Sequence, residues 1–211
     1  MKSVILSVQP KWCELIASGK KTIEVRKTAP KEVPFKVYIY QTKKRITLKT
    51  FKEDYSNGII HNAKLLKAHG KVIGEFICDK VYKIEPDGEY YTYGYDIDDD
   101  SLEETCLTRE DLTAYGKSKP LYGWHISDLK IYDKPKELSE FGKKIDRFKR
   151  YSSELGMCSY ECGECEYFDY PDNPIYEAGE CCADRLNDGV CPLIRPPQSW
   201  CFCQEVKYDT V

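Results

Sequence analysis

The sequence predicts an α+β protein: a small, partly open β-barrel with flanking helices, followed by a small cysteine-rich C-terminal module. Short apolar or alternating segments, which are typical of strands, outnumber the helical segments. Their connections are irregular and helices do not alternate with strands, which argues against a doubly wound sheet. Eight of the eleven cysteines lie between Cys158 and Cys203, which indicates a separate module.

The first expected elements are a strand and a helix. Residues 3–8 (SVILSV) are short, apolar and β-branched, as in a buried strand. Pro10 suits the first turn of a helix, where its missing N–H costs nothing, and Gly19 is a natural C-terminal cap. The apolar stripe of this helix comprises Trp12, Leu15 and Ile16.

Two further strands are expected after this helix. Residues 21–27 (KTIEVRK) alternate with a period of two, and residues 37–41 (VYIYQ) form another apolar run. The alternation predicts two faces for the first of these strands. One face carries Ile23 and Val25, and the other carries Thr22, Glu24 and Arg26.

The middle of the chain is expected to hold an insertion, a strand and a loop. Residues 42–70 are polar and lysine-rich, with a helix expected around residues 62–67. Residues 71–85 predict one long strand, bent at Gly74. Residues 86–104 are acidic, rich in tyrosine and interrupted by glycine, and are expected to form a loop.

Four further elements complete the prediction. Thr108, with an acidic residue three positions later, predicts the start of a short helix that Gly116 ends. Residues 121–132 predict a strand and residues 135–150 a charged helix. Residues 198–202 predict a strand that returns to the barrel.

We expect a barrel domain over residues 1–150 and a cysteine-rich extension over residues 151–211. No stretch approaches the ~20 apolar residues that a membrane span requires. The N-terminal apolar run is shorter than that of a secretory signal and does not end in small residues. The sequence therefore predicts a cytoplasmic protein without a membrane partner.

The formal net charge of −3 conceals an uneven distribution. Residues 11–52 contain twelve Lys or Arg against three Glu, whereas residues 85–111 contain eleven acidic residues against one Arg. The basic block is the candidate anion-binding surface. The alternative is that these lysines only solvate exposed strand faces.

The segment Gly19–Arg26 matches the pattern Gly-x-Lys-x-x-Glu-x-Arg. The glycine lets the chain reverse, Lys21 follows at the turn, and the strand period places Glu24 and Arg26 on one face. Such a group can hold a phosphate or a carbonyl, together with a nucleobase edge. The alternative is an exposed Glu–Arg pair that contributes little.

Three segments in order resemble the ASCH domain, a PUA-like barrel: LSVQPKWCELIASGKKTIEVRK, GKVIGEF and YGWHISDLKIYDKPKELSEF. The resemblance covers residues 1–150 and is closest to short bacterial and phage-encoded members. It implies a cleft between barrel and helix that carries Lys21, Glu24 and Arg26. It also implies a role in binding RNA or a modified nucleoside.

Some ASCH relatives hydrolyse acetylated cytidine with a lysine, a threonine and a glutamate, and others cut RNA. The resemblance matches that lysine to Lys21, but the threonine position carries Glu24, and Thr22 lies one strand repeat away. A hydrolase would need the pKa of Lys21 lowered by burial and neighbouring cations, with Glu24 positioning or shuttling a proton. Glu75 is a candidate second carboxylate.

Aromatic residues suggest stacking surfaces. Tyr122 and Trp124 share one strand face, and Gly123 leaves room for a ligand. His125 follows near the edge of the expected barrel. Tyr40 is a similar candidate. The alternative is that these aromatic rings belong to the core.

The cysteine-rich segment predicts structural zinc, because cytoplasmic thiols stay reduced and a segment with a small core gains folding energy from a metal. An iron–sulfur cluster and unliganded cysteines are the alternatives. The predicted ligands are Cys162, Cys165, Cys181 and Cys191, with Cys158 and Cys182 as possible replacements.

The leading functional prediction is a module that binds RNA or a modified nucleoside. The second is a hydrolase, acting as a nucleoside amidohydrolase or a ribonuclease on the same residues. The third is a protein-interaction module in which the cysteine-rich tail binds a partner of unknown identity.

Overall fold

The computed structural model describes residues 1–43, 47–87, 94–144, 190–193 and 195–206. The chain divides into two compact units, each of which is described separately. The first comprises Met1–Pro135 and Pro197–Cys201, and the second Lys136–Pro196 and Phe202–Val211. In the described part of the chain, no helix is long and apolar enough to cross a membrane.

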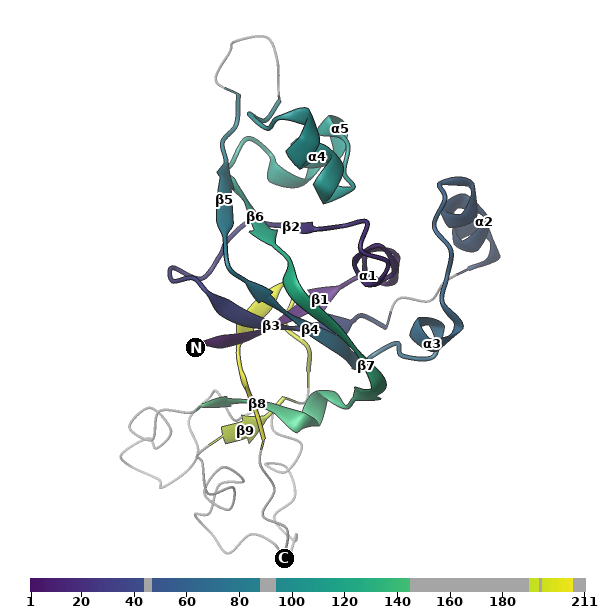
Figure 1. Ribbon diagram of the computed structural model, residues 1–211, viewed down its shortest axis with the longest axis vertical. Coiled ribbons are helices and arrows are strands. Elements are labelled where there is room, and N and C mark those ends of the chain that lie inside the picture. The colour runs from purple at the N-terminus through teal and green to yellow at the C-terminus, as the bar shows by residue number, and fades with distance from the viewer. Residues whose placement is uncertain (44–46, 88–93, 145–189, 194, 207–211) are drawn as a thin grey trace, which may run out of the picture. The chain divides into compact units, whose positions relative to one another are not determined.

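A five-stranded sheet forms the base of the first unit (Figure 1). Its order is β10-β1-β3-β4-β7, with β1 parallel to β3 and β3 antiparallel to β4. The predicted return of the C-terminal strand is confirmed, because β10 lies beside β1. The strands are β1 (Ser3–Val8), β3 (Phe35–Gln41), β4 (Val72–Cys78), β7 (Ser127–Lys136) and β10 (Trp200–Phe202).

A second sheet holds β2 (Ile23–Arg26), β6 (Leu121–His125) and β5 (Val81–Ile84) in that order, all antiparallel. The chain crosses between the two sheets after β4 and again after β6. The expected single strands over 71–85 and 121–132 are therefore wrong, because each divides where the chain changes sheet. The α+β class is confirmed, but the described strands form open sheets and no closed barrel.

The helices combine predicted and unexpected elements. Helix α1 (Pro10–Ala17) begins with proline as predicted, α3 (Ala63–Leu66) lies in the expected insertion, and α5 (Arg109–Gly116) has the predicted start. There, Thr108 and Asp111 form a reciprocal capping box.

Two helices were not predicted, α2 (Leu48–Ser56) and α4 (Asp99–Thr105). The side chain of Thr47 caps α2 by accepting from Thr50 N, and that of Asp98 caps α4 by accepting from Ser101 N. Helix α4 is polar and has no apolar stripe, and the apolar residues of α2, Leu48, Phe51 and Tyr55, stand in a polar, lysine-rich segment that was expected to be an insertion.

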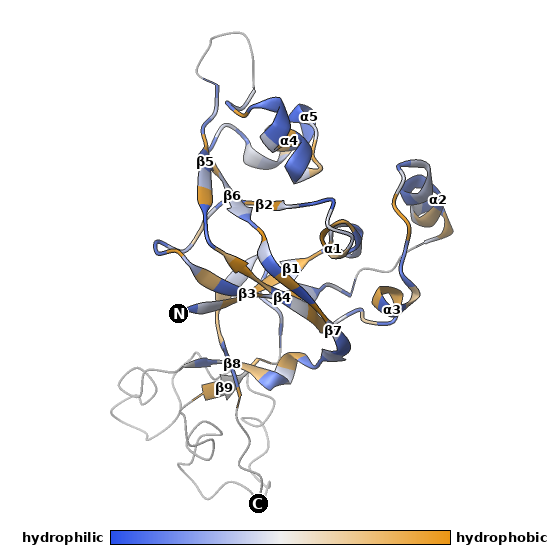
Figure 2. Cartoon of the chain, in the orientation of Figure 1, coloured by the Kyte–Doolittle hydropathy of each residue, from blue (hydrophilic) through white to orange (hydrophobic). Residues whose placement is uncertain are grey.

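Two apolar clusters organise the first unit (Figure 2). The larger contains Val4, Leu6, Val37 and Ile39 of the first sheet together with Trp124 of β6. The smaller contains residues of β2, β5 and β6 and Leu112 of α5. Because Ile23 and Val25 belong to the smaller cluster, Glu24 and Arg26 face the other way, as the strand period predicts.

The described part of the second unit is a three-stranded antiparallel sheet in the order β11-β8-β9, with a short 3-10 helix at Leu138–Glu140. The charged helix expected over residues 135–150 is wrong for the described residues, because β8 pairs with both neighbours and buries Phe141. Residues 145–150 lie outside the described residues. The strands are β8 (Phe141–Lys144), β9 (Val190–Pro192) and β11 (Gln204–Glu205).

Candidate functional site

The three charged residues of the motif form a buried ion network. Lys21 Nζ lies 3.4 Å from Glu24 Oε2, and Arg26 Nη2 lies 2.7 Å from Glu24 Oε1. The Lys21 and Glu24 side chains are 2% and 6% exposed, and that of Arg26 is 12% exposed. The structure thus brings the three together, with a single carboxylate shared between two cations.

Local structure explains how the motif reaches this place. Gly19 has a φ of 74°, which allows the chain to leave α1 in a left-handed turn. The backbone N–H of Lys21 then donates to Leu15 O at 3.0 Å, and β2 begins two residues later. In β2, Glu24 and Arg26 lie opposite residues of β6 on the face directed toward the larger cluster.

The last turn of α4 covers the network. Lys21 Nζ donates to Thr105 O at 2.5 Å, and the backbone N–H of Thr22 donates to Glu104 O at 3.0 Å. The C-terminal end of a helix suits an ammonium group, because its carbonyl oxygens carry partial negative charge. Thr22 Oγ1 is buried and has no hydrogen-bond partner.

The electrostatics of the network are unbalanced. Burial lowers the pKa of Lys21, and the Glu24 carboxylate opposes that shift. Arg26 Nη2 also donates to Ser7 O of β1 at 2.9 Å, but Arg26 Nε is buried without a hydrogen-bond partner. With all three groups ionised, the network carries a formal charge of +1.

Aromatic rings with nearby cations border the network. Trp12 of α1 is partly buried, with Lys11 Nζ 4.7 Å and Lys21 Nζ 5.1 Å from its ring centroid. Tyr115 of α5 is 37% exposed, with Lys27 Nζ 4.9 Å from its ring centroid. These distances lie within the range of cation–π attraction. We call Trp12, Tyr115, Lys11 and Lys27 the rim.

Two aromatic residues predicted to bind a ligand belong to the core instead. Trp124 is fully buried, and its ring centroid lies 5.1 Å from that of Phe35 and 5.7 Å from that of Trp200, both edge to face. Tyr40 is 2% exposed. Their faces are occupied because tertiary packing closes the sheets over them, so neither offers a stacking surface in this structure.

Two other candidates lie in separate contacts. His125 Nδ1 is 2.6 Å from Asp79 Oδ1, a partly exposed pair at the end of β6. The Glu75 carboxylate accepts from Tyr132 at 2.6 Å and from Lys36 at 3.2 Å. Glu75 is therefore engaged with these partners rather than with Lys21.

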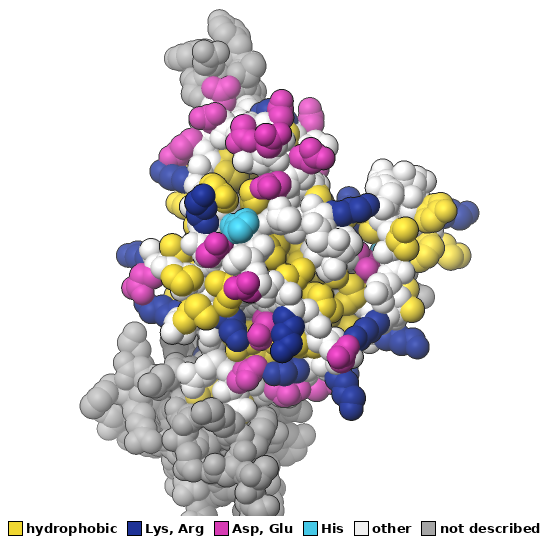
Figure 3. Space-filling view, viewed as in Figure 1, with side chains coloured by type: hydrophobic (Ala, Val, Ile, Leu, Met, Phe, Trp, Pro, Cys, Tyr) yellow, Lys and Arg dark blue, Asp and Glu magenta, His cyan; other side chains and the backbone are white. Residues whose placement is uncertain are grey.

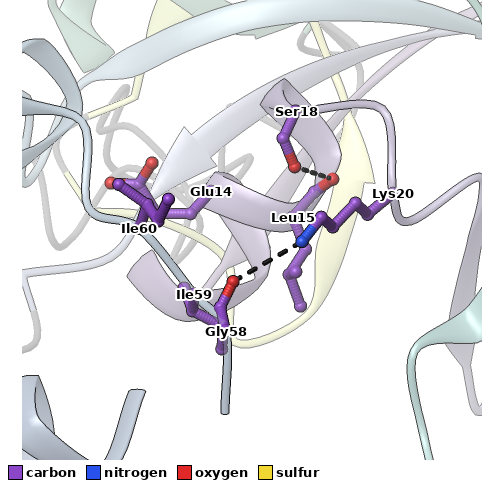
Figure 4. A pocket seen from close by; sticks show the side chains of 7 residues that line it. All are labelled: Glu14, Leu15, Ser18, Lys20, Gly58, Ile59 and Ile60. Carbon is purple, nitrogen blue, oxygen red and sulfur yellow. Dashed lines mark hydrogen bonds between the residues drawn. The ribbon is translucent and has the colours of Figure 1, made fainter. Parts of the chain in front are cut away.

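A pocket of about 100 Å³ lies between α1 and residues 58–60 (Figure 4). Lys20 Nζ approaches Gly58 O to 3.5 Å across it. None of its lining residues belongs to the ion network. The lining residues are Glu14, Leu15, Ser18, Lys20, Gly58, Ile59 and Ile60.

The predicted zinc ligands are not tested by the structure. Cys162, Cys165 and Cys181 lie outside the described residues, and only the backbone of Cys191 is described, in β9. Among the described residues, no group of three or more His, Cys, Asp or Glu is placed to hold a metal ion.

Sequence reasoning missed several residues that shape the site. The helical period places Trp12 in the apolar stripe of α1, although the neighbouring Lys11 marks a polar side of that helix. Tyr115 precedes the terminal Gly116 of α5, and no local pattern connects it with the motif. Ser7 and Thr105 contribute backbone carbonyls, which no sequence pattern identifies.

Comparison with known proteins gives one family and one group of structures. The sequence model described as the ASCH domain matches residues 6–135. The crystal structure of ASCH from Zymomonas mobilis is similar at 18% identity, covering 65% of this chain and 74% of that one, with a TM-score of 0.43. Structures of two mutants of the same protein give 17% and 18% identity, 65% coverage of this chain, 77% and 75% coverage of theirs, and TM-scores of 0.43. No curated protein matches the chain significantly.

Proposed function

The chain belongs to the ASCH domain family, and we propose that it binds RNA or a modified nucleoside at the Lys21–Glu24–Arg26 network and its rim. ASCH domains are PUA-like domains associated with RNA binding. The proposal for this chain depends on the charges and unused donors of its own residues.

The observation that carries the proposal is the imbalance of the network. Two cations share one carboxylate, and Arg26 Nε has no partner. A buried donor without a partner costs about 1–3 kcal/mol. Arg26 Nε is closed to solvent in this structure, so a ligand acceptor gains that energy only if binding opens the network. A phosphate oxygen or a base carbonyl would also offset the excess positive charge.

The rim supports a nucleotide rather than a simple anion. Trp12 and Tyr115 offer aromatic rings on which a base can stack, and such stacking contributes about 1–3 kcal/mol per base. Lys11 and Lys27 lie beside these rings and can contact phosphates. A small inorganic anion would use the cations but not the rings.

A binding experiment with matched tyrosine variants tests this proposal. Tyr115→Ala is expected to weaken binding of a labelled single-stranded RNA about tenfold or more, given the stacking energy. Tyr82→Ala is the control, because Lys80 Nζ lies 5.2 Å from the Tyr82 ring in a similar pair away from the motif. Fluorescence anisotropy measures the RNA affinity of the wild-type protein and of both variants at low and high salt.

Two results would contradict the proposal. If no RNA and no nucleoside binds at low salt, the proposed function fails. If Tyr115→Ala and Tyr82→Ala lose equal affinity, binding occurs without the rim, and the network is only structural.

Hydrolysis is a second candidate, favoured by one observation. Burial lowers the pKa of Lys21, which increases the fraction of neutral amine available as a base or nucleophile. In this structure Lys21 Nζ donates a hydrogen bond to Thr105 O, so the last turn of α4 would have to move before a substrate could reach the Lys21 amine. Turnover of acetylated cytidine or RNA that is lost in Lys21→Ala supports this activity. Equal turnover in both proteins assigns it to another site.

We also propose that the cysteine-rich extension binds structural zinc through Cys162, Cys165, Cys181 and Cys191. The support is the sequence pattern alone: a Cys-x-x-Cys pair and further cysteines in a short segment.

A further inference from the structure

Helix α2 presents one face that the rest of the first unit does not cover. Leu48, Phe51, Lys52 and Tyr55 follow the spacing i, i+3, i+4 and i+7, so they share one side of the helix. Leu48 is 83% exposed and Tyr55 71% exposed, and Lys52 is also exposed. Phe51 is 41% exposed, with its ring stacked on that of His61 at a centroid distance of 5.0 Å. Figure 3 shows apolar side chains gathered over α2 with basic side chains at their border.

The segment that carries this face, residues 47–67, is here called the arm, and buried contacts hold it on α1. Asp54 Oδ2 lies 3.1 Å from His61 Nε2, and the His61 side chain is 1% exposed. Glu14 Oε1 of α1 accepts from Asn62 N at 2.9 Å and lies 3.6 Å from His61 Nδ1. These buried contacts therefore fix the position of α2 and its exposed face against α1.

The arm and its flanks are strongly basic. Over residues 42–70 the sequence has more Lys and Arg than acidic residues, and one of its two acidic residues, Asp54, is buried. Glu53 is the exposed acidic residue of the described part of this segment. The exposed cations described there include Lys43, Lys49, Lys52 and Lys64.

We infer that the exposed face of α2 is a second contact surface for a single-stranded RNA bound at the ion network; this rests on the proposed function. The arm joins the motif directly, because Lys20 Nζ contacts Gly58 O just after α2 ends. Aromatic rings interleaved with lysines suit bases and phosphates together. The RNA would run from the rim past Lys20 onto Tyr55 and Lys52.

Charge and an open aromatic ring together favour RNA as the occupant. A polyanion complements the excess of exposed lysines, and the Tyr55 ring, 71% exposed, is open to stacking with a base. An apolar partner would instead use Leu48, the most exposed apolar side chain of the face.

Binding of two ligands of different length tests this inference. The first is a short ligand, a single nucleoside, which cannot occupy both proposed surfaces at once. The second is a labelled single-stranded 12-mer. Tyr55→Ala is expected to weaken 12-mer binding about tenfold while leaving the short ligand unchanged. Lys52→Glu is expected to lower the salt slope of 12-mer binding by about 0.7 for each phosphate that the lysine no longer neutralises.

Two controls separate the explanations. Lys31→Glu makes the same charge change on an exposed lysine between β2 and β3 and is expected to keep the wild-type salt slope. Leu48→Ser removes an exposed aliphatic side chain from the same face and is expected to keep 12-mer affinity. Because Tyr55, Lys52 and Leu48 are exposed, these variants are expected to fold, which thermal unfolding checks.

The outcomes distinguish the two proposals. Wild-type protein that binds neither ligand removes the proposed function and this inference together. Wild-type protein that binds both, with 12-mer affinity unchanged in Tyr55→Ala and Lys52→Glu, overturns the inference alone. Equal losses in Leu48→Ser and Tyr55→Ala, or wild-type binding to anionic vesicles in place of the 12-mer, overturn RNA as the occupant.

Discussion

Replacing Glu24 by glutamine tests the buried ion network most directly. Glu24→Gln keeps the size of the side chain but removes the carboxylate between Lys21 and Arg26, which lie 3.4 and 2.7 Å from its oxygens. Removing one partner of a buried ion pair costs about 3–5 kcal/mol, because the other charge remains desolvated. We expect a value near the lower end of that range, since the glutamine oxygen can still accept from Arg26.

Such a loss is a large part of the total stability. Domains of this size unfold with about 5–15 kcal/mol, so a loss of about 3 kcal/mol is readily measured. Urea unfolding followed by tryptophan fluorescence is suitable, because Trp12, Trp124 and Trp200 are the three tryptophans of the chain and all belong to the first unit. The free energy of unfolding is compared at neutral pH, with the slope of the urea dependence checked for each variant.

Glu75→Gln is the matched control. Glu75 also pairs with a lysine, Lys36 at 3.2 Å, but the two side chains are 21% and 28% exposed. Partly exposed pairs contribute about 0–1 kcal/mol. A loss in Glu24→Gln no greater than that in Glu75→Gln would refute a desolvated charge imbalance, since it would show that solvent reaches the network.

Three further predictions concern other parts of the chain. Burial raises the pKa of Cys78 to about 12, so the folded protein keeps a proton that the unfolded chain releases above its ordinary thiol pKa. Between the ordinary thiol pKa and about 12, the free energy of unfolding should therefore fall by up to about 1.4 kcal/mol per pH unit. Cys78→Ala should remove that part of the pH dependence, as measured by urea unfolding at a series of pH values. Gly74→Ala should lower the melting temperature through a loss of about 1–3 kcal/mol, because its Cβ would collide with Lys130 O of β7; an unchanged melting temperature would contradict this packing. Elemental analysis of the full chain should find about one zinc ion, reduced in Cys162→Ser but not in Cys106→Ser; equal zinc in both would exclude Cys162 as a ligand.

The sequence predicted correctly those helix ends that are determined by neighbouring residues. Pro10 and Gly19 bound α1, and the Thr108–Asp111 pair begins α5, because capping depends on residues within one turn. Polar helices such as α4 escaped prediction, since a hydrogen bond at the N-terminal cap stabilises them without an apolar stripe. The helix prediction failed at residues 141–144, because the pairing of β8 with β9 and β11 overrides the preference of these residues for a helix.

The candidate site shows the same division. The period of two in β2 determined from sequence alone that Glu24 and Arg26 share a face opposite Ile23 and Val25, because successive side chains of a strand must alternate. Only the tertiary structure decided that this face is buried. Lys21 Nζ is buried where it donates to the carbonyl oxygen of Thr105, 84 residues further along the chain. Burial depends on which distant segments meet, and no local pattern records that.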